Sequence, residues 1–480
     1  MYDHVAFLAS DEMQGRDTPS PELKKAAEYI AADFKQNGLL PVSEGGSYFQ
    51  HFNTLKVKLD APNALSVSTN GEENEFRIKN DFVPLHLSGS KTVDAPVVFV
   101  GYGIDAPEYG YNDYADIDVK DKVVLVLSNE PQQKDSTSIF DGAKNTDYSK
   151  LFVKVETALQ YGAVGMLYIR NPNNNIGRRP PNSWPSLMRK KLKNFEVPLT
   201  LEQPQDQKLV AMAIGKKIGD ALMGESTTTT LSDLQTLIDE NLNPQSRELM
   251  GVTVNMTVSL HAETLPTQNV VGYIQGTDLK DEFLVIGAHY DHVGVHHGEV
   301  YNGADDNASG SAGVMEIAEA FATCGQKPRR SVVFMTFAGE EKGLYGSRYY
   351  TDNPVFPIEH TVAMLNMDMI SRNDSNEVAI VGWRTSEDLK KINEKENESI
   401  NMKLDYDQER YFRQSDHYPF YTKEIPVITY NTKTHEDLHK PTDDIEKIIP
   451  EKMARIGRLV FSTAWNLANT EGRPAFTPIK

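Results

Sequence analysis

The pattern of apolar and polar positions predicts a helix near the start of the chain. Ser20 and Pro21 read as a cap and a first-turn proline, and Asn37-Gly38 as a stop signal. Between them the apolar residues recur at helical spacing: Leu23, Ala26, Ala27, Ile30 and Phe34. We therefore expect a helix that packs one face against a core.

From about residue 60 the pattern changes to short apolar runs separated by turns. Residues 97–100, 122–127 and 164–169 are largely apolar throughout, which is typical of strands buried on both faces. Residues 151–161 show helical spacing between the last two of these strands. Residues 171–186 are rich in Asn, Pro and Arg and are expected to form an irregular loop.

From about residue 265 apolar runs alternate with helical patterns, which indicates an α/β sheet. Two helices stand out, at residues 311–323 and 451–469. The predicted strands are 269–274, 283–288, 331–337, 362–367, 378–381 and 426–430.

Length and composition limit the classes of protein that this pattern can represent. A chain of 480 residues is long enough for two or three domains, and no run of about 18 apolar residues predicts a membrane span. The net charge of −19 argues against binding to nucleic acid or another phosphate-rich surface. The single cysteine, Cys324, excludes an intrachain disulfide and a zinc cluster held by thiolates.

Polar side chains gather where the predicted strands of the C-terminal region end. His289-Tyr290-Asp291, Glu340-Glu341 and Asp368 each follow a strand, Asp305-Asp306 precedes a helix, and His439 follows the last strand. Alone, a His-x-Asp segment is more typical of a surface or hydrogen-bonding pair, an acidic pair before a helix of a cap, and adjacent glutamates of a solvated loop. Together they are expected at one edge of the sheet, where imidazole and carboxylate groups could hold two metal ions.

In their order and in their residues, these segments resemble the motifs of the co-catalytic zinc peptidases. This family includes bacterial leucine aminopeptidases, glutamate carboxypeptidases and glutaminyl cyclases. The resemblance spans roughly residues 265–470. The matching segments are His289-Tyr290-Asp291, Gly303-Ala304-Asp305-Asp306-Asn307-Ala308-Ser309-Gly310, Ala338-Gly339-Glu340-Glu341, Asn366-Met367-Asp368-Met369, Ser415-Asp416-His417 and His439-Lys440-Pro441-Thr442-Asp443.

The resemblance implies an α/β fold with a mixed central β-sheet flanked by helices, and an inserted β-rich domain. Residues 1–60 would be the N-terminal part of the peptidase domain, 61–244 the insert, and 245–480 the zinc peptidase domain. Residues 121–127 and 162–166 look like part of a protease-associated domain. Such an insert is expected either to select substrates or to act as a plain lid.

The resemblance also implies the chemistry of each site residue. Asp291 would orient a histidine ligand, and Glu340 would be the general base for the attacking water. A cis peptide bond would follow the bridging aspartate. For two Zn²⁺ ions the implied ligands are His289 and Asp368 on one ion, Glu341 and His439 on the other, and Asp306 between both.

The remaining histidines near these motifs are not expected to bind metal. His292, His296 and His297 would lie in the rim of the pocket or in a solvated loop. His417 is expected to be a structural hydrogen-bonding residue in the pocket wall. His435 precedes His439 by four residues, but the sequence around it favours a loop over a helix that would pair them.

One position departs from the family pattern. Many active members carry tyrosine before the last histidine, where its hydroxyl assists the oxyanion, and this chain has Leu438. Tyr430, Tyr421 or Arg413 could replace that hydroxyl, and the sequence does not choose between them.

The resemblance favours an aminopeptidase that acts on peptides with a free N-terminus. A glutamate carboxypeptidase-like activity is the alternative, with Arg410 and Arg413 able to clamp a terminal carboxylate. A single-zinc glutaminyl cyclase and a catalytically inactive binding protein also remain open. We expect a secreted, periplasmic or surface-anchored protein after signal-peptide removal. The preferred N-terminal residue and the oligomeric state are left open.

Overall fold

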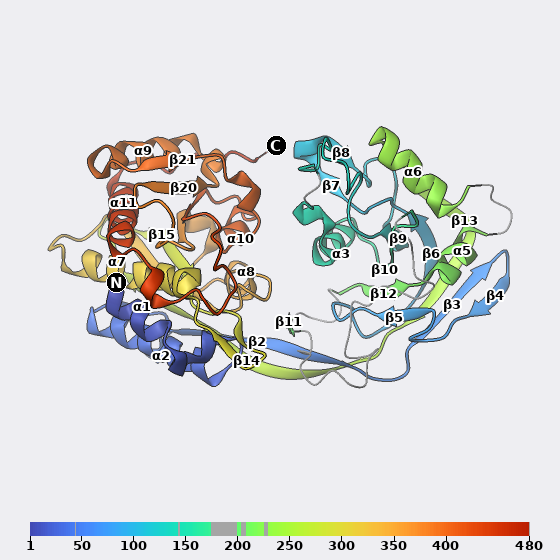
Figure 1. Ribbon diagram of the computed structural model, residues 1–480, viewed down its shortest axis with the longest axis horizontal. Coiled ribbons are helices and arrows are strands. Elements are labelled where there is room, and N and C mark those ends of the chain that lie inside the picture. The colour runs from blue at the N-terminus through green and yellow to red at the C-terminus, as the bar shows by residue number, and fades with distance from the viewer. Residues whose placement is uncertain (44, 143–144, 174–198, 203–207, 225–228, 480) are drawn as a thin grey trace. The chain divides into compact units, whose positions relative to one another are not determined.

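The computed structural model describes residues 1–43, 45–142, 145–173, 199–202, 208–224 and 229–479. The chain forms two compact units (Figure 1), of which the first contains Met1–Thr54 and Leu265–Ile479 and the second contains Leu55–Thr264. The second unit is thus wider than the insert of 61–244 predicted from the sequence. Strands β2 (Phe49–Leu59) and β14 (Leu260–Ile274) run across its two boundaries.

The first unit is built on a mixed sheet. The described strands follow the order β11-β2-β14-β18-β15-β19-β22-β20-β21, of which β11 belongs by its residue numbers to the second unit, and β1 also pairs with β14. Strands β18, β15, β19 and β22 are parallel, whereas β14 and β20 join them in antiparallel fashion. The sheet therefore confirms the predicted fold class. Its further bounds are β1 (Leu40–Pro41), β11 (Leu199–Leu201), β15 (Leu279–His289), β18 (Arg330–Phe337), β19 (Thr361–Met367), β20 (Glu377–Val381), β21 (Lys403–Asp405) and β22 (Val427–Asn431).

Helices cover both faces of this sheet because its central strands are apolar on both sides. On β18, Val333 and Met335 share a core with helices α8 (Tyr345–Asp352) and α10 (His417–Tyr421). Phe334, between them, packs edge-on against Phe321 of α7 (Gly310–Thr323). Phe321 also contacts two aromatic rings of α11 (Pro450–Asn469), so α7 and α11 lie on the opposite face.

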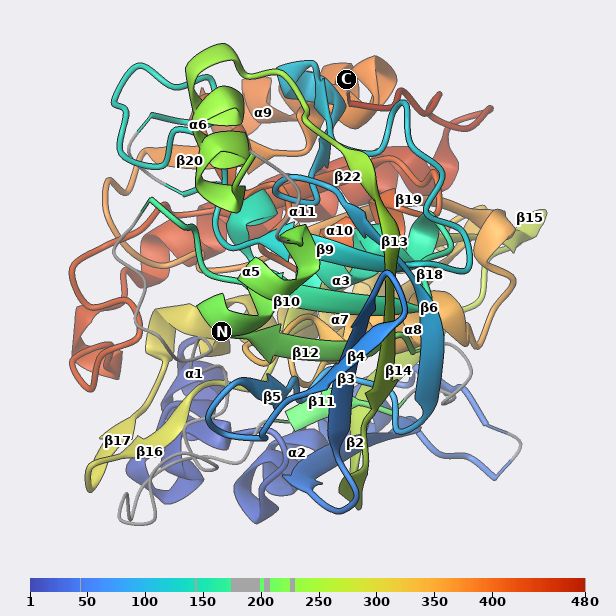
Figure 2. The same cartoon turned by 90° about the vertical axis from the view of Figure 1, so that its right-hand side faces the viewer.

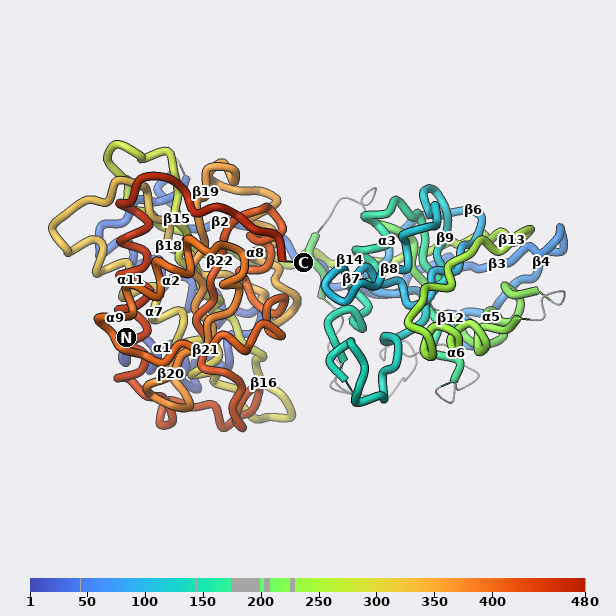
Figure 3. Tube along the Cα trace, turned by 90° about the horizontal axis from the view of Figure 1, so that it is seen from above, coloured from blue at the N-terminus to red at the C-terminus, as the bar shows by residue number. Residues whose placement is uncertain are grey.

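The N-terminal helices pack within the first unit. Helices α1 (Tyr2–Leu8) and α2 (Pro21–Gln36) both contact α7, and the tube in Figure 3 shows blue and red segments together there. The cap predicted for α2 is present, because Oγ of Ser20 accepts a hydrogen bond from the Leu23 N–H at 3.0 Å. The predicted apolar stripe of α2 is buried, which confirms the first helix. Strands β16 (Gly294–His296) and β17 (Glu299–Tyr301) form a hairpin, and α9 (Glu387–Ile400) packs on α11.

The second unit is rich in β-structure. Its larger sheet follows the order β4-β3-β13-β6-β9-β10-β12-β5, with β6, β9, β10 and β12 parallel. A small hairpin joins β7 (Asp105–Ala106) to β8 (Tyr111–Asn112). The other bounds are β3 (Ala64–Thr69), β4 (Glu72–Glu75), β5 (Phe82–Pro84), β6 (Thr92–Phe99), β9 (Val123–Leu127), β10 (Gly165–Ile169), β12 (Val210–Ile214), β13 (Arg247–Thr257), α3 (Leu151–Gln160), α5 (Lys216–Met223) and α6 (Leu231–Asn241).

Strand β9 shows why this second sheet has two cores. Val123 and Leu125 belong to the core that includes α5 and α6, whereas Val124 and Val126 belong to the core that includes α3. Figure 2 shows the strands of this sheet from one side. Helix α5 contacts β3 and β13. The three strands and the helix predicted in this region are present. Most of the loop predicted at 171–186 lies outside the described residues. Within them, no helix has the length and apolarity that crossing a membrane requires.

Candidate metal centre

Parallel strands bring the predicted site residues to one edge of the first sheet. His289 is the last residue of β15, Glu340 and Glu341 follow β18, and Asp368 follows β19 directly. Because these strands are parallel, their carboxyl ends lie at the same edge. Asp306 reaches this edge from the turn before α7.

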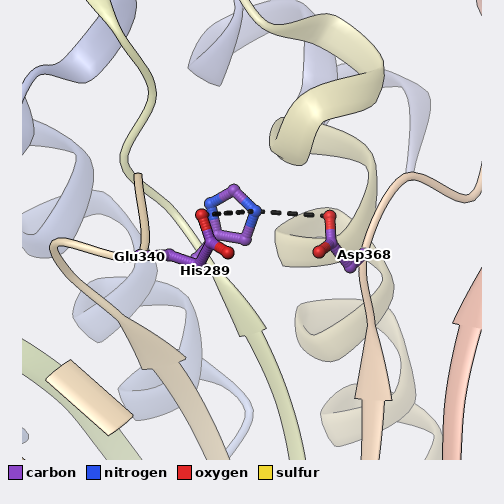
Figure 4. A group of neighbouring side chains, drawn as sticks. All are labelled: His289, Glu340 and Asp368. Carbon is purple, nitrogen blue, oxygen red and sulfur yellow. Dashed lines mark hydrogen bonds and ion pairs between the residues drawn. The ribbon is translucent and has the colours of Figure 1, made fainter. Parts of the chain in front are cut away.

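His289 lies among three carboxylates. Its Nε2 is 3.3 Å from Oδ1 of Asp306 and 3.3 Å from Oδ1 of Asp368, and 3.9 Å from Oε2 of Glu340. Figure 4 shows the imidazole between Glu340 and Asp368. The ring is buried, which opposes protonation, but the surrounding carboxylates outweigh burial and raise the pKa of His289 well above its usual value. The nitrogen is therefore placed where a cation is strongly favoured.

His439 forms a second group around the other oxygen of Asp306. Its Nε2 is 3.0 Å from Oδ2 of Asp306 and 3.1 Å from Oε2 of Glu341. Hydrogen bonds to these two carboxylates raise the pKa of His439 to about 11. The two oxygens of Asp306 thus face different histidines, His289 on Oδ1 and His439 on Oδ2.

The chemistry of these groups fits zinc. Among the described residues, two sets of three side chains have ligand atoms within 4.8 Å of one another: His289, Glu340 and Asp368, and His292, Asp306 and Glu341. Imidazole nitrogen and carboxylate oxygen are preferred zinc ligands, and sites without cysteine are typical of catalytic zinc. These two sets have no residue in common, but Asp306 connects them because its Oδ1 faces His289 of the first set while its Oδ2 faces His439. Two adjacent metal ions are the arrangement of two-metal hydrolases.

Asp291 supports the site in a different way from a simple carboxylate–imidazole pair. Nδ1 of His289 hydrogen-bonds at 3.2 Å to the backbone carbonyl of Asp291, whereas the nearer carboxylate oxygen is 3.7 Å away. That carboxylate accepts hydrogen bonds from the Thr18 hydroxyl at 3.0 Å and from the Glu340 backbone N–H at 3.2 Å. The geometry therefore links Asp291 to the position of Glu340 as well as to His289.

Glu340 has the environment of a group with high proton affinity. Burial raises its pKa well above the usual range, and the charges of Glu341 and Asp368 raise it further against the opposing effect of His289. Asp306 behaves in the opposite way. Hydrogen bonds to His289 and His439 overcome its burial and hold the pKa of its carboxyl well below the usual range.

The turn that carries Asp306 is tied to β19. The Asp306–Asn307 peptide bond is cis, at the position where the sequence resemblance implied one. The Asn307 side chain donates to the carbonyl of Met367 at 2.9 Å and accepts from the N–H groups of Gly310 and Met369 at 2.9 and 3.1 Å. The backbone around the shared carboxylate is thus fixed to the strand that precedes Asp368.

Arg16 is a supporting residue that the sequence did not reveal. It is 0% exposed, and its guanidinium donates to four backbone carbonyls, those of Leu8, Tyr290, Asn302 and Gly303. These carbonyls belong to α1 and to the loops on either side of the metal centre. Arg16 lies almost 300 positions from its loop partners, so no local pattern could have signalled these contacts.

A second supporting network holds the loop that carries His439. The carboxylate of Asp443 accepts from the backbone N–H groups of Asp305 and Asp306. Nη2 of Arg372 is 2.6 Å from Asp437, and its Nη1 is 3.5 Å from Asp443. Arg372 therefore contacts one carboxylate before His439 in the sequence and one after it, and no local pattern signals these contacts.

The structure corrects the prediction for His292. This residue is buried rather than solvated, and its Nδ1 lies 2.8 Å from Oε1 of Glu341. His297 is exposed at the hairpin turn and His296 is half-buried in β16, as expected for a rim. His435 lies 3.2 Å from Asp305 and away from the two ligand groups.

The structure also places three further residues that the sequence analysis named: His417, Tyr430 and Tyr421. His417 is buried with its ring 5.3 Å from that of Phe412, and within the described residues neither ring nitrogen has a side-chain hydrogen-bond partner. Burial lowers the pKa of His417, and a hydrogen bond with the Phe412 backbone opposes this effect, in keeping with the structural role predicted for the residue. Tyr430 is buried and donates its hydroxyl to Asn393, so it cannot replace the tyrosine missing at Leu438. The Tyr421 hydroxyl accepts from the Ile479 N–H.

Known proteins resemble the chain in this region. The family model described as peptidase family M28 matches residues 269–464. A probable zinc metalloprotease of Leptosphaeria maculans is 26% identical over 276 residues, covering 47% of this chain and 64% of that protein. A probable leucine aminopeptidase of Arthroderma benhamiae is 28% identical over 230 residues, covering 42% of this chain and 64% of that protein. The chain thus spans just under two thirds of the length of these relatives.

The fold has a counterpart among solved structures. An aminopeptidase from Aneurinibacillus sp. strain AM-1 aligns over 100% of this chain and 95% of its own, with a TM-score of 0.50 and 22% identity. This likeness concerns the fold alone. The family match falls on the segment that carries every candidate ligand from His289 to His439, so residues 269–464 of this chain are similar to peptidase family M28.

Proposed function

We propose that this protein is an aminopeptidase that uses two zinc ions to remove the N-terminal residue of peptides. The observation that carries the proposal is the position of Asp306, whose two oxygens lie 3.3 Å from His289 and 3.0 Å from His439. Asp368 completes the first group and Glu341 the second. The names of the relatives, a probable zinc metalloprotease and a probable leucine aminopeptidase, support zinc and the N-terminal cleavage.

Glu340 is the proposed proton carrier. Two zinc ions, when bound, supply Lewis-acid chemistry that lowers the pKa of water and polarises the scissile carbonyl. Glu340 takes a proton from the attacking water as the new C–O bond forms, and it returns that proton to the amine nitrogen as the C–N bond breaks. Its position 3.9 Å from Nε2 of His289 and the hydrogen bond from its backbone N–H to the Asp291 carboxylate support this role.

The proposal extends to the second unit and to the location of the protein. We assign the second unit to the protease-associated domains, supported by its parallel strands β6, β9, β10 and β12 and by α3 between β9 and β10. Following the family resemblance, we place the protein outside the cytoplasm, as a secreted, periplasmic or surface-anchored protein.

The test compares leucine 4-nitroanilide with its N-acetylated form, using zinc-loaded protein. Only the free-amine substrate should release the chromophore, and Glu340→Ala should lower the rate by about 10²–10⁴-fold while zinc remains bound. Bound zinc should approach about two ions per chain.

Three outcomes would contradict the proposal in different ways. Cleavage of acetylated dipeptides with a free C-terminus, but not of leucine 4-nitroanilide, would indicate a carboxypeptidase. Cyclisation of N-terminal glutamine at a ratio of about one zinc per chain would indicate a glutaminyl cyclase. No reaction despite two bound zinc ions would indicate an inactive binding protein.

A further inference from the structure

His292 holds the oxygen of Glu341 that His439 does not contact. Nδ1 of His292 is 2.8 Å from Oε1 of Glu341, whereas Nε2 of His439 is 3.1 Å from Oε2. The two oxygens of this carboxylate are thus engaged by two different histidines. No other pair of histidines among the described side chains divides one glutamate in this way.

The position of His292 is fixed from three sides. Its backbone N–H donates to the carbonyl of Arg16 at 3.2 Å, and its side chain is 0% exposed. A Cβ atom at Gly303 would lie 2.5 Å from the His292 ring, so only glycine leaves room for the imidazole there. The ring of His439 stands edge-on to it, with centroids 5.6 Å apart. The imidazole therefore has little freedom to turn away from Glu341.

The contacts of Nδ1 favour a hydrogen bond over metal ligation. At 2.8 Å from Oε1 of Glu341, Nδ1 is at hydrogen-bonding distance, while Oδ2 of Asp306 is farther away at 3.8 Å. A nitrogen that donates to a carboxylate carries a proton and has no free lone pair for an ion. His439, in contrast, is about equally close to Asp306 and Glu341, as a shared ligand would be.

We propose that His292 is a positioning residue for Glu341 and that its Nδ1–H holds Oε1, leaving Oε2 for the ion shared with His439 and Asp306. This inference rests on the proposed two-zinc function. A carboxylate held through one oxygen presents the other in a fixed direction, whereas a free carboxylate must be ordered when the ion binds. His292 thereby strengthens the second site selectively, since it has no contact with Asp368.

Metal titration of the full-length chain tests this role without relying on peptidase activity. Metal-free protein is titrated with Co²⁺, followed by visible absorption, and with Zn²⁺, followed by calorimetry. His292→Leu removes the donor at similar volume. It should lower the affinity for one of the two ions by about 10–100-fold and leave the affinity for the other unchanged. His292→Asn places an amide N–H near the position of Nδ1 and should restore most of this affinity.

His296→Leu, in the neighbouring hairpin, is the matched control and should leave both affinities as in the wild type. Thermal unfolding of each metal-free variant checks that it is folded. Equal affinities in His292→Leu and wild type would overturn the proposal. An affinity of His292→Asn as low as that of His292→Leu would also overturn it, because that result would make His292 a ligand or a packing residue.

The same titration separates this inference from the proposed activity. Two ions bound by the wild type without cleavage of leucine 4-nitroanilide would refute the aminopeptidase and leave the role of His292 standing. Fewer than two ions bound by the wild type would overturn both.

Discussion

Replacing Arg16 by methionine measures how strongly one buried guanidinium holds the loops of the metal centre. The side chain donates to the carbonyls of Leu8, Tyr290, Asn302 and Gly303, and all four would lose a buried donor together. Methionine keeps a similar length and apolar volume, so the change removes hydrogen bonds and charge rather than creating a large cavity.

The magnitude follows from these contacts. Burial lowers the pKa of Arg16 to about 10, against the raising effect of Asp291 and other nearby carboxylates, so the group stays charged at neutral pH. Four hydrogen bonds from a charged donor contribute about 1.5 kcal/mol each, and relief from burying the charge offsets part of that sum. We expect a loss of about 3–5 kcal/mol, which corresponds to a fall in Tm of about 6–15 °C for a unit of this size.

Calorimetry of the metal-free full-length chain is the assay. Arg329→Met is the matched control, because Arg329 pairs at the surface with Asp278, and such pairs contribute about 0–1 kcal/mol. Arg16→Lys should fall between the two, because it keeps the charge and loses the fork of donors. A Tm for Arg16→Met equal to that of Arg329→Met would refute the reasoning, since it would mean that the four carbonyls find other partners.

Two further substitutions test the surroundings of the site. Arg372→Met removes one of the contacts of Asp437 and Asp443, which flank His439 in the sequence. The zinc bound by His439 should therefore bind about 10-fold more weakly in a titration, while the exposed control Arg384→Met has no effect. Equal zinc affinities would show that the loop needs no clamp. For His417, burial lowers the pKa to about 3 from 6.5, so the unfolded chain takes up a proton between these values and the folded chain does not. Acidification below pH 6.5 should therefore destabilise the first unit by about 1.4 kcal/mol per pH unit. His417→Phe should show a shallower fall in unfolding free energy with decreasing pH, and parallel curves would contradict the assignment.

Several elements could be predicted from the sequence because their signal is local. The strands β15, β18 and β19 are buried on both faces and therefore appear as continuous apolar runs. The helix α2 carries its own cap and apolar stripe. Helix α9 was missed, since Leu389 is its only buried apolar residue and its other positions are polar. The long strand β2 was missed as well, although its burial partly alternates as a half-buried strand requires.

The amino-acid sequence by itself determined the order of the motifs, the parallel strands that carry them and the types of side chain at their ends. Those features depend on short segments, in which periodicity and composition are visible. The tertiary structure alone decided which groups support the site. Arg16 contacts Gly303 across 287 positions, Arg372 contacts Asp437 across 65, and His292 contacts Glu341 across 49. Each contact exists only because distant loops fold to one edge of the sheet. No local pattern encodes such pairs, because their free energy comes from burial and hydrogen bonds that form after the strands have assembled.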